Sequence, residues 1–285
     1  MGWKLTQSPA RELNRARIQE ERKRAVNFKA AMRQRLSPSA YGLFARGARA
    51  AAGWWYRDDL SHLAIVFGSD KWGSHWYTQH YQRYFWPLRR RHLNVLEIGV
   101  GGYDDGAAGA ESLRMWKAFF RKSRIVGIDI QDKTRFREQR IEIRRCDQTD
   151  SDALQRLCHE YGGFDIVIDD GSHFNEHVIK SFQALFPRLR PNGIYVVEDL
   201  QTAYWPAWGG GVGDPRSSMA FFKGLVDGLN HQEYPIQNYE PSYFDRNIVE
   251  IAFFHNLVFI RKGENNESSN DPGSIQREIE AERSN

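Results

Sequence analysis

Acidic residues gather at two places in the second half of the sequence, each at the end of an apolar run. The run FDIVIDD ends in Asp169 and Asp170, and the run GIYVVEDL contains Glu198 and Asp199. Because the carboxyl ends of parallel strands meet at one edge of a sheet, these carboxylates are expected to converge. Clustered carboxylates repel one another, and a hard divalent cation such as Mg2+ relieves that repulsion. The group as a whole is therefore predicted to hold a metal ion, although helix capping or ordinary ion pairs would explain any single acid.

One histidine follows this group closely. His173 lies three residues after Asp170, where it could reach a hydroxyl group bound to such a metal. A neutral imidazole is a suitable general base near pH 7, and a metal ion lowers the pKa of a bound hydroxyl. The sequence thus predicts that His173 deprotonates a substrate hydroxyl. His177, one helical turn further on, is expected to lie on the face of a helix.

A glycine-rich turn precedes the acids in the sequence. The segment 97–102, EIGVGG, ends an apolar run, and its glycines let the backbone approach a ligand closely. A nicotinamide-binding fingerprint would need Gly at position 104, where the sequence has Asp104. The E-x-G-x-G form is instead similar to the first motif of methyltransferases that bind S-adenosylmethionine. Taken alone, the turn is equally compatible with a purely structural role.

Polar residues also end the next two predicted strands. Asp129 ends the strand after the glycine turn, and its carboxylate could accept hydrogen bonds from both ribose hydroxyls. Asp147 and Gln148 end the third strand, where a polar pair could read the adenine edge. Together these positions predict S-adenosyl-L-methionine as the cofactor. The expected cofactor-binding residues are Glu97, Gly99, Gly101, Asp129, Asp147, Gln148 and Asp169.

Short apolar runs alternate with helical stretches between residues 93 and 200, which is typical of a doubly wound, mostly parallel α/β sheet. Two further runs within 248–262, separated by a tight turn at His255-Asn256, predict an antiparallel hairpin that closes this sheet. Such a hairpin is the pattern of class I methyltransferases. We therefore expect a seven-stranded Rossmann-like sheet with an N-terminal helical extension. The first five strands are expected at 93–100, 124–130, 141–147, 164–170 and 193–200.

Composition and charge divide the 285 residues into three parts. Residues 1–60 are predicted to form a basic helical extension, 61–263 the methyltransferase domain, and 264–285 a mobile charged tail. With 41% hydrophobic residues the chain can bury a core, which excludes global disorder. The basic N-terminus could contact an anionic surface, although a solvated or oligomer-packing helix is the favoured interpretation. No nucleic-acid partner is expected.

Cysteine usage and the distribution of apolar residues bear on the compartment. Cys146 and Cys158 are the only cysteines, and they form neither a disulfide framework nor a zinc pattern. The sequence start lacks the apolar region of a signal peptide, and no stretch approaches the roughly 20 apolar residues that span a bilayer. A cytoplasmic location is therefore expected.

Five segments, in order, resemble the macrolide deoxysugar O-methyltransferases of the mycinamicin type. The chain also resembles the mycobacterial enzymes that methylate hydroxyls of rhamnose or mannose units and, more remotely, the cephalosporin hydroxylase group. The resemblance covers about residues 60–262. The segments are GSDKWGSHWYTQHY (68–81), LEIGVGGY (96–103), IVGIDI (125–130), FDIVIDDGSH (164–173) and YVVEDLQTAYWP (195–206).

The resemblance implies methyl transfer from S-adenosylmethionine to a hydroxyl of a rhamnose, mannose or deoxysugar unit, carried by a glycoside, polysaccharide, glycolipid or antibiotic. It implies that Asp170, Glu198 and Asp199 bind Mg2+, that His173 is the general base, and that the protein is a homo-oligomer. It also implies that the segment 68–81 folds over the active site. An acceptor-site loop is suggested by the aromatic residues before the glycine run at 209–211. The expected acceptor-binding residues are Lys71, His75, Tyr77, Tyr204 and Trp205.

Three other functions remain compatible with parts of the sequence. Methylation of a catechol-like aromatic diol would also use a metal and a carboxylate cluster. An iron oxygenase like the cephalosporin hydroxylase relatives would favour two histidines and one carboxylate, whereas acids outnumber histidines here. A non-catalytic protein that binds an anionic polymer or membrane through the basic N-terminus is disfavoured by the intact cluster.

Overall fold

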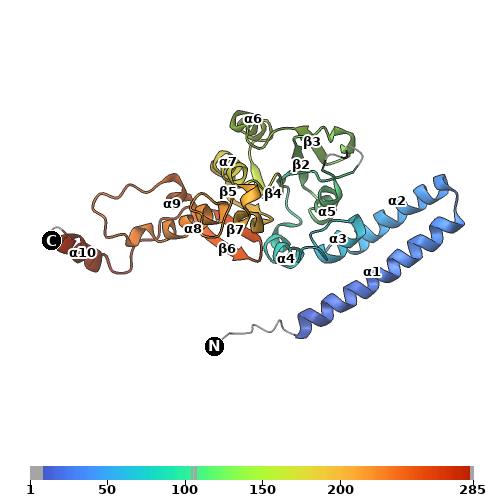
Figure 1. Cartoon of the computed structure of the whole chain (residues 1–285), viewed down its shortest axis with the longest axis horizontal. Helices are drawn as coiled ribbons and strands as arrows, with labels where there is room; N and C mark the ends of the chain where they lie inside the picture. The colour runs from blue at the N-terminus through green and yellow to red at the C-terminus, as the bar shows by residue number, and fades with distance from the viewer. Residues whose placement is uncertain (1–8, 104, 106–107, 283–285) are drawn as a thin grey trace. The chain divides into compact units, whose positions relative to one another are not determined.

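The computed structural model describes residues 9–103, 105 and 108–282 (Figure 1). Asp104, on which the argument against a nicotinamide cofactor depended, lies outside these residues. The chain divides into two compact units. The first contains the residues up to Arg91 together with Arg114–Arg121, and the second contains His92–Leu113 and Lys122–Asn285. The helix that begins at residue 60, where the sequence predicts a boundary, packs with the helices before it. The predicted domain boundaries stay a prediction.

The first unit is helical. Its helix ends follow ordinary capping rules: the Ser37 side chain accepts a hydrogen bond from Ala40 N, and Asp59 does the same for His62 N. Gly68, with a left-handed backbone, ends the third helix. Aromatic side chains, among them Tyr81 and Phe85, fill its interior. The elements are α1 (Pro9–Arg35), α2 (Pro38–Trp55), α3 (Leu60–Phe67), α4 (Thr78–Phe85) and the 3-10 helix η1 (Trp86–Leu88).

The second unit contains a seven-stranded sheet with the strand order β3-β2-β1-β4-β5-β7-β6. The first five strands are parallel, and β7 pairs antiparallel with both β5 and β6. The predicted fold, with its C-terminal hairpin, is thereby confirmed. The strands are β1 (Asn94–Ile98), β2 (Arg124–Asp129), β3 (Ile141–Arg145), β4 (Phe164–Asp169), β5 (Leu189–Val197), β6 (Ile248–Phe254) and β7 (Leu257–Lys262).

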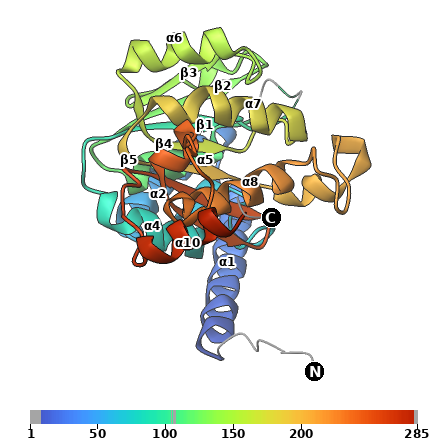
Figure 2. The same cartoon turned by 90° about the vertical axis from the view of Figure 1, so that its left-hand side faces the viewer.

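Helices between the strands supply the apolar side chains that cover one face of the sheet. α6 and α7 lie side by side, and α7 also packs against α8 (Figures 1 and 2). Their core includes Leu154, Val178 and Phe182 together with strand residues such as Ile98 and Val167. The remaining elements are α5 (Glu111–Phe119), η2 (Thr134–Phe136), α6 (Ser151–Tyr161), α7 (Asn175–Leu185), η3 (Phe186–Arg188), η4 (Leu200–Tyr204), η5 (Pro206–Trp208), α8 (Ser218–Gly228), η6 (His231–Glu233), α9 (Tyr243–Asn247) and α10 (Pro272–Glu282).

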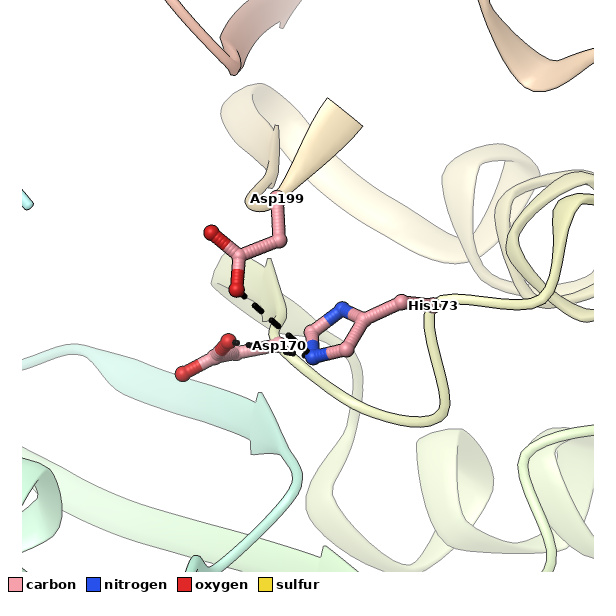
Figure 3. Close-up of side chains that lie close together, drawn as sticks. All are labelled: Asp170, His173 and Asp199. Atoms are coloured by element: carbon pink, nitrogen blue, oxygen red, sulfur yellow. Dashed lines mark ion pairs between the residues drawn. The ribbon is translucent and has the colours of Figure 1, made fainter. Parts of the chain in front are cut away.

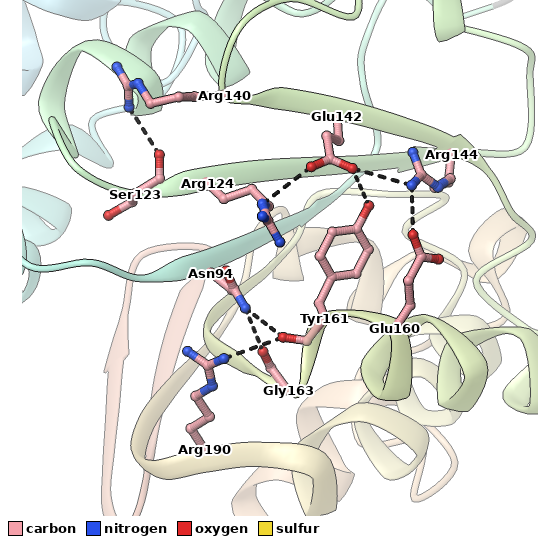
Figure 4. A network of polar contacts seen from close by, with 10 residues as sticks. All are labelled: Asn94, Ser123, Arg124, Arg140, Glu142, Arg144, Glu160, Tyr161, Gly163 and Arg190. Carbon is pink, nitrogen blue, oxygen red and sulfur yellow. Dashed lines mark hydrogen bonds and ion pairs between the residues drawn. The ribbon is translucent and has the colours of Figure 1, made fainter.

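A network of polar contacts lies near the N-terminal ends of the parallel strands (Figure 4). Glu142 accepts hydrogen bonds from Tyr161 Oη at 2.7 Å and from Arg144 at 3.2 Å, and it also pairs with Arg124. Asn94 Nδ2 donates to the carbonyl oxygens of Tyr161 and Gly163. Here the Glu142 carboxylate is paired with cationic and hydroxyl groups. At the opposite ends of the strands, several carboxylates lie near one another.

The stretch after Gly263, expected to be a mobile charged tail, contains the helix α10. Asp271 accepts a hydrogen bond from Ser274 N at 3.0 Å, and Pro272 occupies the first helical position, so the helix has a regular start. Across the residues that the structure describes, no helix is long and apolar enough to cross a membrane.

Candidate active site

The carboxyl ends of β1 and β4 lie side by side at the point where the strand order reverses. In open α/β sheets, the loops that leave two such strands diverge and create a ligand crevice. Gly99, directly after β1, has a φ of 92°, and a Cβ there would collide with the carbonyl oxygen of Asp170. Only glycine therefore allows the β1 turn to pass so close to the end of β4.

The acids predicted from the strand ends do converge at this edge (Figure 3). Two groups of possible metal ligands share Asp170: one adds His173 and Asp199, and the other adds Glu97 and Glu198. Within each group the ligand atoms lie within 4.8 Å of one another. Oxygen ligands of one Mg2+ lie about 3 to 4 Å apart, since each is about 2.1 Å from the ion. The donor set and its spacing thus fit a hard divalent cation after small side-chain movements.

The imidazole of His173 points into this cluster (Figure 3). Its Nε2 atom lies 3.8 Å from Asp199 Oδ2 and 4.0 Å from Asp170 Oδ1, which is beyond hydrogen-bond range. Both His173, with φ 58°, and Asp199, with φ 54°, adopt the left-handed backbone conformation. That conformation costs a non-glycine residue about 1–3 kcal/mol and is found preferentially at functional sites.

The Glu97 carboxylate, expected at the cofactor, lies with those of Asp170 and Glu198. Its contact with a cofactor stays a prediction. The side chain is fully buried, and its Oε2 atom accepts a hydrogen bond from Ser112 Oγ at 2.8 Å. In the sequence, the signal for this position was an acidic residue within the otherwise apolar run of β1.

Two of the expected cofactor residues hold their own loops in shape. The Asp129 carboxylate accepts hydrogen bonds from Val100 N at 2.9 Å and from Gln131 N at 2.8 Å. It thereby ties the glycine turn to the end of β2. Asp147 Oδ1 accepts from both the backbone N and the side-chain hydroxyl of Thr149. These hydrogen bonds lower the pKa of Asp147. Their contacts with a cofactor stay predictions.

Asp169 and Gln148, also expected at the cofactor, form a buried hydrogen-bonded pair. Gln148 Nε2 donates to Asp169 Oδ1 at 3.3 Å. Burial raises the pKa of Asp169 to about 6, and the hydrogen bond from Ser181 acts in the opposite direction. Both side chains are buried, and their contacts with a cofactor stay predictions.

Aromatic side chains surround His173 on the side of η5. The ring centroid of Trp208 lies 6.2 Å from that of His173 and 5.1 Å from that of Phe174. Asn175 secures this arrangement, since its Nδ2 donates to the carbonyl oxygens of Thr202 and Trp208. Sequence analysis missed Phe174 and Asn175, because an aromatic residue and an amide at a helix start have many structural uses.

The remaining acceptor candidates lie in two places. Tyr204 and Trp205 are on η4 and just after it, with 44% and 48% of their surfaces exposed. Lys71, His75 and Tyr77 belong to the helical unit, where Lys71 is fully buried and the His75 ring stacks on Tyr77 at 4.8 Å. Acceptor binding by any of the five stays a prediction.

Lys133 is a further residue that sequence analysis missed. Its Nζ atom is buried and donates to the carbonyl oxygens of Tyr103, Asp105 and Ala108, at 2.7–3.2 Å. A lysine ammonium has three N–H donors, and this one uses all three on the loop after the glycine turn. No sequence pattern distinguishes such a lysine from a surface one, because the contact depends on how two distant loops meet.

Similar proteins point to one family. No known protein-family model matches the chain. Over 208 residues it is 52% identical to 8-demethyl-8-alpha-L-rhamnosyl tetracenomycin-C 2'-O-methyltransferase of Streptomyces olivaceus. This match covers 72% of this chain and 55% of that protein. It is 48% identical over 231 residues to mycinamicin VI 2''-O-methyltransferase of Micromonospora griseorubida, with 79% and 57% covered. The chain thus spans little more than half the length of these relatives.

A solved structure gives the same result. The MycE methyltransferase from the mycinamycin biosynthetic pathway, in complex with Mg and SAH, matches with a TM-score of 0.71 and 47% identity. The match covers 77% of this chain and 58% of that one. Sequence and fold therefore point to the same relatives. Over its matched residues, this chain belongs to the family of macrolide and tetracenomycin sugar O-methyltransferases.

Proposed function

We propose that this protein transfers a methyl group from S-adenosyl-L-methionine to a hydroxyl of a sugar unit, with Mg2+ bound by Asp170, Glu198 and Asp199. The observation that carries this proposal is the meeting of several carboxylates and one imidazole at the switch point of a methyltransferase-type sheet. The Mg and SAH in the MycE complexes support the choice of metal and cofactor. The buried Glu97 is a further candidate ligand on the Glu198 side of the cluster.

His173 has the role of general base in this proposal. Its Nε2 atom takes the proton of the acceptor hydroxyl, since this is the nitrogen that faces Asp170 and Asp199. Once protonated, the imidazole is stabilised by these two carboxylates. Bound Mg2+ would lower the pKa of the acceptor hydroxyl and compensate the negative charge of the acids.

The cofactor would lie along the glycine turn after β1. Gly99, Gly101 and Gly102 all have positive φ, and this backbone leaves no Cβ between the turn and a ligand. The methyl donor and the acceptor oxygen would then meet above the ends of β1 and β4. In such a transfer the protein mainly orients the two reactants.

The acceptor we favour is the 2-hydroxyl of rhamnose or a related deoxysugar. The relatives named for 2'- and 2''-O-methylation are 52% and 48% identical to this chain. Those named for 3-O- and 3'-O-methylation are 37% and 40% identical. Assembly into a homo-oligomer, contact of the basic helices with an anionic surface, and a cytoplasmic location stay predictions.

A panel of rhamnosyl, mannosyl and deoxysugar glycosides, together with an aromatic diol, tests this function with isotopically labelled S-adenosylmethionine. The expected result is label on one sugar hydroxyl, with linkage analysis locating it at position 2. Label on an aromatic diol and on none of the sugars would replace the proposal with catechol-type methylation. Label at position 3 would retain the reaction class and reject the regiochemistry.

A further inference from the structure

The residue before Asp170 has no place in the proposed reaction, yet its side chain has unusually many hydrogen bonds. Asp169 is 1% exposed. Its Oδ2 atom accepts hydrogen bonds from Ser181 Oγ at 2.5 Å and from Tyr195 Oη at 3.3 Å. These two donors come from α7 and β5, so the carboxylate is held from beneath by two elements of the sheet unit.

The other contacts of Asp169 lead to the loop that separates Asp170 from His173. Ser172 N donates to Gln148 Oε1 at 2.7 Å, and Gln148 Nε2 in turn donates to Asp169 Oδ1 at 3.3 Å. The backbone amide of Ser172, which lies between the metal-ligand candidate and the base, is therefore fixed by Asp169 through Gln148.

Close packing also fixes the loop 171–172 against Gln148. A Cβ on Gly171 would collide with Gln148 Oε1 and with the Ile98 side chain, so the loop rests directly on the amide of Gln148. On its other side, Ser172 Oγ and His177 Nδ1 are 2.9 Å apart. The left-handed backbone of His173 follows immediately and persists only where neighbouring contacts enforce it.

We propose that Asp169 and Gln148 are positioning residues that set the place of the His173 imidazole relative to Asp170. This inference rests on the proposed role of His173 as the base. It differs from the sequence-based prediction, in which both residues contact the cofactor. The two assignments have different consequences: a cofactor contact governs S-adenosylmethionine affinity, whereas a positioning residue governs the turnover of bound reactants.

The first test removes the hydrogen bond between the two side chains by replacing its donor with an acceptor. The Q148E variant places a second carboxylate against the buried one of Asp169, and their repulsion removes the acceptor of Ser172 N. We expect kcat to fall about 100-fold, the effect of misplacing a reacting group by roughly 1 Å, and the Kd for S-adenosylmethionine to change less than about twofold. Loss of cofactor affinity equal to the loss of kcat would overturn the proposal.

The second test is rescue. In the Q148E/D169N double variant, the amide introduced at position 169 donates to the carboxylate introduced at position 148, which can again accept from Ser172 N. The double variant should recover kcat to within about fivefold of wild type. D169N alone should have a small effect, because hydroxyl groups such as that of Ser181 can rotate to accept from an amide. A double variant no better than Q148E contradicts the proposal.

A measurement independent of activity keeps the inference separate from the proposed function. Amide hydrogen exchange at Ser172 should accelerate at least about tenfold in Q148E and return toward wild type in the double variant. Unchanged exchange in an active enzyme would refute positioning while leaving methyl transfer intact. Restored exchange in a protein without transferase activity would refute the proposed function and leave the hydrogen-bonded support intact. As a matched control at the opposite ends of the strands, E142Q should lower stability without altering exchange at the Ser172 amide.

Discussion

Two histidines of this chain each lie between two carboxylates, one in each compact unit, and they differ in how closely the acids approach. In the helical unit, His62 Nδ1 lies 2.8 Å from Asp59 Oδ2, and Nε2 lies 2.8 Å from Glu21 Oε2. In the sheet unit, both acids face the same nitrogen of His173, at 3.8 and 4.0 Å. The first pair of distances describes hydrogen bonds, and the second does not.

The same residue types therefore serve opposite purposes. His62 is part of a regular helix, stacks on Tyr56 with ring centroids 4.4 Å apart, and uses both nitrogens within the unit. Such an arrangement links α1 to α3 and leaves no room for a substrate atom between the imidazole and its acids. His173 has a left-handed backbone and a wider spacing, into which a ligand can enter. Spacing and backbone, rather than residue type, therefore distinguish the structural His62 from His173, the proposed base.

The largest expected difference between the two histidines is in catalysis. H173A removes the proton acceptor and should lower kcat about 1,000-fold, within the range for general-base catalysis, with little change in the Kd for S-adenosylmethionine. H62F, which retains an aromatic ring on Tyr56, should leave kcat within about threefold of wild type. Steady-state kinetics with labelled cofactor, beside calorimetric binding, distinguish the two. A comparable loss of kcat in both variants would contradict the assignment of His173 as the base and His62 as a structural residue.

The acids beside the two histidines should show the same contrast: Asp199 should matter for turnover and Asp59 for stability. D199N removes a metal-ligand candidate and should lower turnover at least about 100-fold. Its thermal stability should hold within about 0.5 kcal/mol, because Asn tolerates the left-handed conformation and one repelling charge is lost. D59N breaks a hydrogen bond to a charged ring and should lose about 1–2 kcal/mol of stability with full activity. Activity assays and thermal unfolding of both purified variants provide the check.

The pH dependence of stability should identify His62 as the structural one. Its hydrogen bond with Asp59, and then that with Glu21, raises its pKa above the ordinary value of 6.5, against the effect of burial. Since the folded state binds the proton more tightly, this stabilisation is fully present below pH 6.5 and is lost as the pH rises through the raised pKa.

At pH 6, H62F should therefore be less stable than wild type by about 1–3 kcal/mol, as expected for hydrogen bonds to a charged group. The difference should shrink toward pH 9. Unfolding midpoints measured between pH 6 and pH 9 test the sign, and a gap that widens with pH would refute the assignment of a protonated His62.

The smallest effect concerns the backbone at His173. Glycine adopts a φ of 58° without steric cost, so H173G should raise the free energy of unfolding by up to about 1 kcal/mol while abolishing turnover. Introducing glycine into the interior of a regular helix normally lowers the free energy of unfolding, and H62G supplies that contrast. Equal destabilisation of H173G and H62G would show that the left-handed residue carries no stored strain.

Much of the sheet unit follows from sequence. Alternating apolar runs and helical stretches identify the seven strands, and the ends of β4 and β5 bring Asp170, Glu198 and Asp199 together because parallel strands end at one edge. The turn at His255-Asn256 places the hairpin, with Asn256 in the left-handed conformation that a tight turn requires.

The unpredicted features depend on contacts between distant segments. Glu97 joins the acid cluster because β1 lies beside β4, and Lys133 secures the β1 loop from the β2–β3 connection. The His62 contacts join α1 to α3 across 41 residues of sequence. The extent of the helical unit, up to Arg91, likewise follows from packing and not from composition. Local patterns contain none of this information, since each pairing is decided by the assembled fold.

The central claim is that the open cluster around His173 holds a divalent cation for methyl transfer. The most direct measurement is transfer of labelled methyl to a rhamnosyl acceptor by protein treated with a chelator and then titrated with Mg2+. We predict that the chelator abolishes transfer, that Mg2+ restores it in the wild type, and that D170N stays inactive at every Mg2+ concentration. Transfer that proceeds at full rate in the presence of the chelator would contradict the account.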